Sequence, residues 1–296
     1  SLVFYNSYLP DIAHKEQQDK ISAKGFSLGY IGSVILLLIC LAMVMMVEET
    51  QAIQMMKYSF LLVGIWWIGF SQYTYYYLPD NKNSNKMHKN VIFNGFRELL
   101  KVWHQIKNIL PLKRYLAAFF VYSMAVHTIM IIAAYFGEKE VQWGSDSKRT
   151  TGLIISILVI QLVAVFGAWI TSKLVEKFGN IKVLMLLNFL WILICTYAYF
   201  VVTPNDFYIA AFFVGLVMGG IQSLSRSTYS KFIPSDTKDT TSFFSFYDVA
   251  EKVGIVIGML TYGYIADITG KIQNAILFLI LFFIVGLLLL LRVPKN

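Results

Sequence analysis

Long apolar segments alternate with short polar ones along this chain. Each apolar segment is about 20 residues long, which is what a helix needs to cross the ~30 Å hydrocarbon core of a bilayer. The pattern predicts eight complete spans and, in residues 1–9, the tail of a ninth that ends at Pro10. The eight predicted spans cover Gly25–Val47, Tyr58–Leu78, Tyr115–Phe136, Thr151–Leu174, Ile181–Val202, Phe207–Ser227, Phe243–Ile265 and Ile272–Leu291.

The composition agrees with an all-α integral membrane protein. Of the 296 residues, 57% are hydrophobic and 14% are charged, whereas a soluble domain carries about a quarter of charged residues. Cys40 and Cys195 both lie within apolar runs, so we expect inert thiols, with no disulfide and no metal site. The first residue is Ser1 and the chain opens inside an apolar segment. We therefore expect the chain to lack part of its N-terminal region.

Basic residues predict the orientation in the membrane, because Lys and Arg concentrate in cytoplasmic loops. Of the 25 Lys and Arg residues, 19 fall in one set of alternate loops and five in the other. This distribution places the C-terminus in the cytoplasm. It also argues against a nucleic-acid partner, since a binding patch would not alternate loop by loop. Lys252 is then the one basic residue that lies outside the loops.

The longest predicted loop, residues 79–111, is cytoplasmic and contains an amphipathic segment. We expect this segment to form a helix on the inner membrane surface. Its apolar residues at helical spacing are Phe96, Leu99, Leu100, Trp103, Ile106 and Leu110. Six spans follow the loop, so the sequence predicts three regions of a twelve-span protein. Residues 1–78 are the remnant of an N-terminal six-helix bundle, 79–111 the linker, and 112–296 a C-terminal six-helix bundle.

The loop between the fourth and fifth predicted spans reads "GAWITSKLVEKFGNIKVL". This resembles the cytoplasmic loop motif of the major facilitator superfamily, with an acid and a base followed by an aromatic residue, glycine and further basic residues. Asn180 departs from it, because it stands where a base is expected. Gly179 would allow the tight turn, and the charged residues could pair with nearby helix ends. The positions that match the motif are Glu176, Lys177, Phe178, Gly179 and Lys182.

Further segments narrow the resemblance to the vacuole-effluxer branch of that superfamily, which includes fungal autophagy-associated vacuolar amino-acid exporters and bacterial relatives. They are "VFYNSYLPDIA", "SAKGFSLGYIGS", "GGIQSLSRSTYSKFIP" and "FFSFYDVAEKVG", in the same order as in that branch. The resemblance implies a major-facilitator-like bundle of twelve spans, alternating access and a small polar solute. This branch often has an Asp-Gly pair in the span where this chain has Met124 and Ala125 followed by His127. His127 is then the polar candidate in that span.

Three charged residues interrupt the seventh predicted span. Asp248, Glu251 and Lys252 share one helical face, with Lys252 about 40° to one side of Asp248 and Glu251 about 60° to the other. Charged residues within spans usually face the bundle interior or a water-filled cavity. The cluster is a candidate substrate or proton site. Two alternatives stay open: a structural Asp248–Lys252 ion pair, and a cluster that lies at the membrane interface.

The sixth span adds Gln222 and Arg226, which share a face at i and i+4. Gln222 is either a donor that lines the solute pathway or part of a helix–helix hydrogen bond. Arg226 lies near the predicted inner end of the span, so we expect it to reach the interface. His127 is either a structural donor or a group that titrates near neutral pH.

These observations predict a secondary active transporter of a small polar solute, with amino acids as candidate solutes and the proton as candidate coupling ion. We expect a lipid bilayer as surroundings, a monomer at full length, and a bacterial cytoplasmic membrane as location. A membrane-embedded enzyme and a non-transporting receptor or scaffold are the alternatives. The chain has no metalloprotease, nucleophile-elbow or phosphate-loop motif, so we predict neither enzymatic activity nor a cofactor.

Overall fold

A computed structural model describes residues 2–78, 91–234, 237 and 239–294, and every element in these ranges is an α-helix. The first two helices are short, and Pro10 lies in the first turn of the second. The helices are α1 (Leu2–Ser7), α2 (Leu9–Ile12), α3 (Gln18–Met45), α4 (Glu49–Tyr77), α5 (Val91–Asn108), α6 (Leu110–Glu140), α7 (Asp146–Phe178), α8 (Asn180–Ala198), α9 (Pro204–Phe232), α10 (Thr240–Thr269) and α11 (Ile272–Leu290).

Each of the eight predicted spans is one continuous helix. Seven of them, α3, α4, α6, α7, α8, α9 and α11, are long and apolar enough to cross a membrane. The eighth, α10, is 30 residues long but is not among these seven. The opening segment differs from the prediction, because α1 ends at Ser7 and a second short helix begins at Leu9. Pro10 lies in the first turn of that helix instead of closing a span. Proline fits there, since the first turn of a helix has no partner for its N–H groups.

Two compact units make up the chain. One contains residues 1–30 and 95–296, and the other contains residues 31–94. The smaller unit holds the rest of α3 and all of α4, and most of the large apolar side chains of α4 are exposed. The prediction of an N-terminal remnant, a linker and a C-terminal bundle concerns the whole transporter and stays a prediction.

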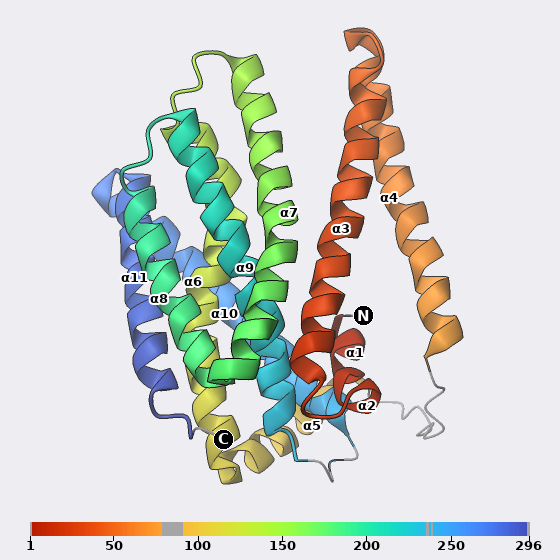
Figure 1. The fold of residues 1–296 in the computed structure, drawn as a ribbon, viewed down its shortest axis with the longest axis vertical. Helices are drawn as coiled ribbons and strands as arrows, with labels where there is room; N and C mark the ends of the chain where they lie inside the picture. The colour runs from red at the N-terminus through yellow and green to blue at the C-terminus, as the bar shows by residue number, and fades with distance from the viewer. Residues whose placement is uncertain (1, 79–90, 235–236, 238, 295–296) are drawn as a thin grey trace. The chain divides into compact units, whose positions relative to one another are not determined.

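In the larger unit, α6 to α11 pack side by side as a helical bundle (Figure 1). The most extensive contact joins α7 and α9, where glycines bring the two backbones together. A Cβ atom on Gly215 of α9 would lie 2.5 Å from the carbonyl oxygen of Ile160 on α7. In the same way, Gly167 of α7 faces the backbone of α9, and Gly219 of α9 faces the backbone of α7. Small residues of this kind allow close packing of spans where water provides no driving force.

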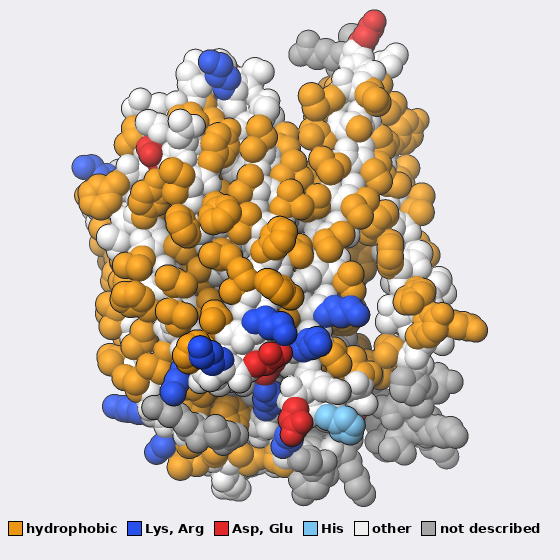
Figure 2. Space-filling view, in the orientation of Figure 1, with side chains coloured by type: hydrophobic (Ala, Val, Ile, Leu, Met, Phe, Trp, Pro, Cys, Tyr) orange, Lys and Arg blue, Asp and Glu red, His pale blue; other side chains and the backbone are white. Residues whose placement is uncertain are grey.

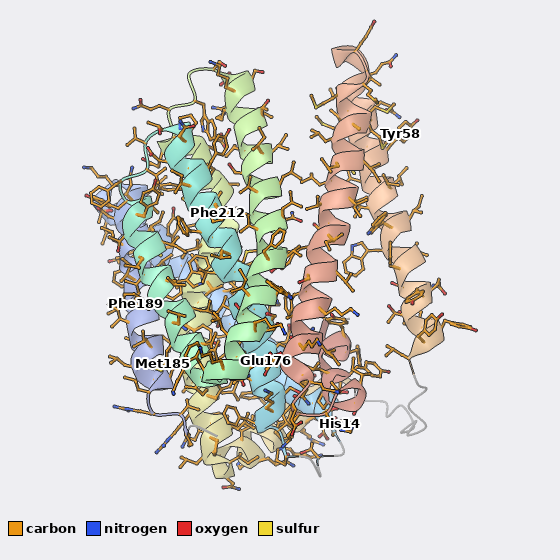
Figure 3. All side chains as sticks on the ribbon, viewed as in Figure 1. His14, Tyr58, Glu176, Met185, Phe189 and Phe212 are labelled. Carbon is orange, nitrogen blue, oxygen red and sulfur yellow. The ribbon has the colours of Figure 1, made fainter. Side chains whose placement is uncertain are left out.

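The core of the bundle is apolar and aromatic, as the stacking of Trp191 on Phe283 at 5.6 Å illustrates. Apolar side chains also cover the outside. Figure 2 shows hydrophobic side chains over the length of the helices, with most of the visible Lys and Arg residues towards one end. Phe189 and Phe212, labelled in Figure 3, are both exposed. An outer surface of this kind is what a lipid-facing bundle requires.

The predicted amphipathic helix forms as α5, and the side that it buries overlaps the predicted apolar face. Val102 and Ile106 are the buried residues, and Trp103 stacks on Phe246 of α10 at 5.6 Å. Of the predicted apolar face, Ile106 is buried and Leu99 and Trp103 are half-buried. Phe96 and Leu100 are exposed, and so is Leu110, which begins α6. The periodicity thus identified the helix and part of its covered side, and its expected position on the inner membrane surface stays a prediction.

Candidate functional site

The predicted charge cluster forms on α10. The ammonium group of Lys252 lies 2.9 Å from the Glu251 carboxylate and 3.8 Å from that of Asp248. The Glu251 side chain is only 13% exposed, whereas that of Lys252 is 55% exposed. Lys252 is therefore closer to its neighbour than to the i+4 partner that the structural alternative required. The ion pair within the helix exists, but Glu251 is its nearer acid.

Local sequence explains the helix that carries the cluster. The Asp239 side chain caps it by accepting the backbone N–H of Ser242 at 3.0 Å. Gly270 ends it with a φ of 65°, a left-handed conformation that glycine adopts without strain. Gly254 and Gly258, a pair of small residues four positions apart, face α6. A Cβ atom on Gly258 would meet the carbonyl oxygen of Met124 at 2.7 Å, so the two helices approach closely beside the cluster.

This close approach brings His127 of α6 to the cluster. Its Nε2 atom lies 3.6 Å from the Glu251 carboxylate, and the His127 side chain is 18% exposed. Glu251 thus lies between a lysine on its own helix and a histidine on another. Two groups that can each hold a proton, beside a fixed cation, form an arrangement that can bind a charged solute or pass a proton.

Gln222 joins three helices, although no contact between it and the charge cluster is present. Its amide oxygen accepts a hydrogen bond from the Tyr30 hydroxyl of α3. Its amide nitrogen points to the sulfur of Met130 at 3.4 Å, and Met130 follows His127 by three residues on α6. Gln222 therefore contacts α6 within one turn of His127. Both predicted roles stay open, because the same amide makes the helix–helix hydrogen bond.

Arg226 is the residue that sequence reasoning placed wrongly. Its side chain does not reach an interface, because the residue is 4% exposed. Its guanidinium nitrogens donate to the Ser22 hydroxyl at 3.0 Å, the Ser22 carbonyl at 3.2 Å and the Asn6 side chain at 3.1 Å. Lys252 is therefore not the one basic residue within the helices. One feature of the sequence could have indicated a buried Arg226, namely that it lies four residues after Gln222 and therefore on the same helical face.

Tyrosine and serine hydroxyls surround this region from the α6 side. Tyr122 and Ser225 are hydrogen-bonded at 2.7 Å, and Tyr115 donates to the Ser225 carbonyl at 2.7 Å. Tyr247, next to Asp248, stacks on Phe119 at 4.1 Å. The hydrogen bonds of Tyr115 and Tyr122 join α6 to α9, and the stacking of Tyr247 on Phe119 joins α10 to α6. The two hydrogen-bonded tyrosines could not be identified from the sequence alone, because their partners are about 100 residues away.

The cytoplasmic loop motif forms a tight turn between α7 and α8. Gly179 adopts a φ of 81° there, as its place in the motif predicts. Glu176, labelled in Figure 3, lies at the end of α7 and pairs with Lys173 of the same helix at 3.5 Å. Lys177 lies over the Phe178 ring. Lys182 is exposed, and its side chain makes no hydrogen bond or ion pair with the described residues.

Asn180, the departure from the motif, makes the contacts that the charged positions do not. Its amide donates to Asp19 of α3 at 2.7 Å and to Thr228 of α9 at 3.0 Å. Lys231 of α9 completes the group, because it pairs with Asp19 and donates to the Asn180 oxygen at 3.1 Å. A neutral amide with donors and an acceptor serves this position better than a base, which could not accept from Lys231.

Comparison with known proteins agrees with this architecture. The sequence model of the Atg22-like vacuole effluxer family matches residues 1–296. The uncharacterized MFS-type transporter YxiO of Bacillus subtilis is 32% identical, over 99% of this chain and 68% of that protein. Autophagy-related protein 22 of Vanderwaltozyma polyspora is 24% identical, over 93% of this chain and 55% of that protein. The chain thus spans about two thirds of the bacterial relative and about half of the fungal one.

The fold has a match among solved structures. The Escherichia coli fucose:proton symporter FucP superimposes with a TM-score of 0.69 over 99% of this chain and 73% of that chain, at 14% identity. At that identity the match concerns the fold alone. The all-α bundle is therefore that of the major facilitator superfamily, and the relatives are transporters rather than enzymes. This chain belongs to the Atg22-like vacuole effluxer family of the major facilitator superfamily, and it is a multi-pass integral membrane protein.

Proposed function

We propose that the protein is a secondary active transporter that moves amino acids across the membrane by alternating access, coupled to protons. The observation that carries the proposal is the position of Glu251 between Lys252 and His127, within a helix that is otherwise largely apolar. Charges are costly within a membrane span and are usually retained there for solute or ion pathways. The resemblance to vacuolar amino-acid exporters supports the choice of solute.

In this proposal Glu251 and His127 form the proton site. When both are charged they attract each other at 3.6 Å. When Glu251 takes up a proton, Lys252 loses its nearer counter-ion, and the positive charge around the site increases. The site then attracts an anionic group of the solute more strongly. Binding of solute and binding of proton therefore favour one another, which is what coupled transport requires.

The polar contacts between α3 and α9 support alternating access. Asp19, Ser22 and Tyr30 of α3 meet Lys231, Ser223 and Gln222 of α9. These contacts are hydrogen bonds and one ion pair, which water can replace when helices separate. An apolar contact surface would resist opening to water more strongly. We call these polar contacts the α3–α9 seam, and we propose that the α3–α9 seam closes in one state of the transport cycle and opens in the other.

The location and the domain organisation belong to the same proposal. The excess of Lys and Arg in alternate loops supports a C-terminus inside the cell, and we propose a bacterial cytoplasmic membrane as the location. We propose residues 1–78 as part of the N-terminal bundle, 79–111 as the cytoplasmic linker and 112–296 as the C-terminal bundle. The transporter would act as a monomer, because each major-facilitator bundle pair encloses its own pathway.

Transport by the full-length protein in proteoliposomes tests this function. We expect an imposed pH gradient to drive accumulation of at least one of the twenty amino acids, and a protonophore to reduce that accumulation at least tenfold. Accumulation that a protonophore leaves unchanged would remove the proton from the proposal. If no amino acid moves in either direction, with or without the gradient, the assignment as an amino-acid transporter fails.

A further inference from the structure

Among its described residues, the larger unit contains a buried cation that has no acidic partner. Within the described part of the chain, no Asp or Glu oxygen lies within 4.0 Å of the Arg226 guanidinium, although the residue is 4% exposed. The acids of α10 lie beside Lys252 instead. A buried charge is normally paired, because removing it from water is costly. Arg226 is therefore a surplus positive charge.

The protein acceptors of Arg226 are all neutral. Nε donates to the Ser22 hydroxyl, Nη2 to the Ser22 carbonyl and Nη1 to the Asn6 side chain. A guanidinium carries five N–H groups, so one N–H on Nη1 and one on Nη2 have no acceptor among the described residues. A carboxylate can take two such groups at once, and such charge-assisted bonds are roughly twice as strong as neutral ones.

Two aromatic rings hold the guanidinium in place. Its Cζ atom lies 4.9 Å from the centre of the Tyr5 ring and 4.8 Å from that of Phe26. Rings at these distances attract the cation through their faces and leave its edge for hydrogen bonds. Gly25 provides space on the α3 side, since a Cβ atom there would lie 3.4 Å from Nη2 of Arg226 and would also meet the Tyr5 hydroxyl.

Arg226 also connects to the charge cluster through its own helix. Gln222 lies one turn earlier on the same face of α9. Through Met130, Gln222 contacts α6 within one turn of His127, the neighbour of Glu251. Arg226 and the proposed proton site are thus connected through Gln222 on α9 and through Met130 and His127 on α6.

We propose that Arg226 binds the carboxylate of the transported solute, so that the solutes are carboxylate-bearing and their amides are excluded. This inference rests on the proposed transport function and identifies the group that selects the solute class. As the α3–α9 seam opens, the carboxylate replaces the neutral oxygens of Ser22 and Asn6 on the guanidinium. Tyr5 and Phe26 keep the guanidinium plane oriented for two parallel hydrogen bonds.

Solute counterflow by the full-length protein in proteoliposomes tests the inference. The probes are the twenty amino acids, the corresponding amino-acid amides, and glucose and glycerol as polar solutes without a carboxylate. The variants are Arg226→Lys, which keeps the charge but loses the planar fork, and Arg226→Gln. Arg149→Gln is the matched control, since Arg149 is a partly exposed arginine paired with Asp146 at the start of α7. Size-exclusion chromatography checks that each variant is folded.

We expect the wild-type protein to prefer an acid over its amide by at least tenfold. Arg226→Lys should reduce this acid-to-amide ratio about tenfold, because a lysine cannot replace a bidentate contact. Arg149→Gln should leave the ratio unchanged. A purely structural Arg226 would lower the flux of acids and amides together and keep the ratio.

Two results would overturn the inference in different ways. If amides, glucose or glycerol move as well as acids, or if Arg226→Lys keeps the ratio, the carboxylate site is wrong while the protein remains a transporter. If the wild-type protein moves none of the probes, the inference fails together with the proposed function. If neither Arg226 variant folds, the acid-to-amide ratio of the wild-type protein decides alone.

Discussion

The Glu251 carboxylate of α10 lies 3.6 Å from the Nε2 atom of His127 on α6. The two residues are more than 120 positions apart in the sequence, and the close packing of Gly254 and Gly258 on α6 brings them together. An acid and an imidazole in contact can share or exchange a proton, whereas either one alone in a span would be an isolated polar group. The proposed coupling mechanism depends on this pair.

Replacing His127 should separate proton coupling from solute movement. We expect His127→Asn to lose accumulation driven by a pH gradient, while counterflow of the same amino acid stays within about twofold of the wild-type protein. Counterflow exchanges loaded carriers and needs no net movement of protons, so it does not require the histidine. His14→Asn is the matched control, since His14 is exposed. Gradient-driven accumulation by His127→Asn at the wild-type level would show that the imidazole takes no part in coupling.

The packing of α10 on α6 can be tested with two glycines of one helix. Gly258→Ala should lower the free energy of unfolding by about 1–3 kcal/mol, because the new methyl group would meet the Met124 carbonyl oxygen at 2.7 Å. Gly263→Ala is the control, since no atom lies within 4 Å of a Cβ atom there. It should stay within about 1 kcal/mol of the wild-type protein.

Thermal unfolding in detergent measures both glycine variants. Because the two substitutions add the same methyl group to the same helix, any difference between them reports the contact with α6. Equal melting temperatures for Gly258→Ala and Gly263→Ala would mean that α6 and α10 are not in close contact, and His127 would then have no fixed position beside Glu251.

The polar group at the ends of α3, α8 and α9 should show strong coupling between residues. A double-mutant cycle with Asp19→Asn and Lys231→Met should give an interaction energy of about 1–3 kcal/mol, since both residues are largely buried and share Asn180. The exposed pair Lys173–Glu176 is the control. It should give no more than about 0.5 kcal/mol.

Melting temperatures of the single and double variants provide both interaction energies. If the Asp19–Lys231 cycle gives no more coupling than the Lys173–Glu176 cycle, the polar seam between α3 and α9 does not hold the described state closed. The alternating-access proposal would then need another closing contact.

The sequence predicted local features well and contacts between distant segments poorly. All eight predicted spans form helices, and seven of these helices are long and apolar enough to cross a membrane, α10 being the exception. A periodicity of 3.6 residues sufficed to place Asp248, Glu251 and Lys252 on one face. The contact of Glu251 with His127 could not be predicted, because it depends on which helices pack together. His127 itself was identified from the resemblance and from its place in a span.

Arg226 illustrates the other limit. Near the end of an apolar run, an arginine usually reaches the interface, so sequence position alone favoured exposure. It is buried because Asn6 and Ser22, some 200 residues earlier, accept its hydrogen bonds. The rings of Tyr5 and Phe26 also pack against its guanidinium group. The covered side of α5 was predicted in part, since Ile106 is buried and Trp103 stacks on Phe246 of α10, whereas Phe96 and Leu100 are exposed.

The most direct test of the central claim compares two acid-to-amide substitutions in one transport assay. Glu251→Gln removes the proposed proton-binding carboxylate, and Glu98→Gln removes an exposed carboxylate that also pairs with a lysine, Lys101, at 2.5 Å. The assay is amino-acid accumulation by the full-length protein in proteoliposomes under a pH gradient. We predict that Glu251→Gln lowers accumulation at least tenfold while Glu98→Gln leaves it unchanged. Wild-type accumulation by a folded Glu251→Gln variant would contradict the account.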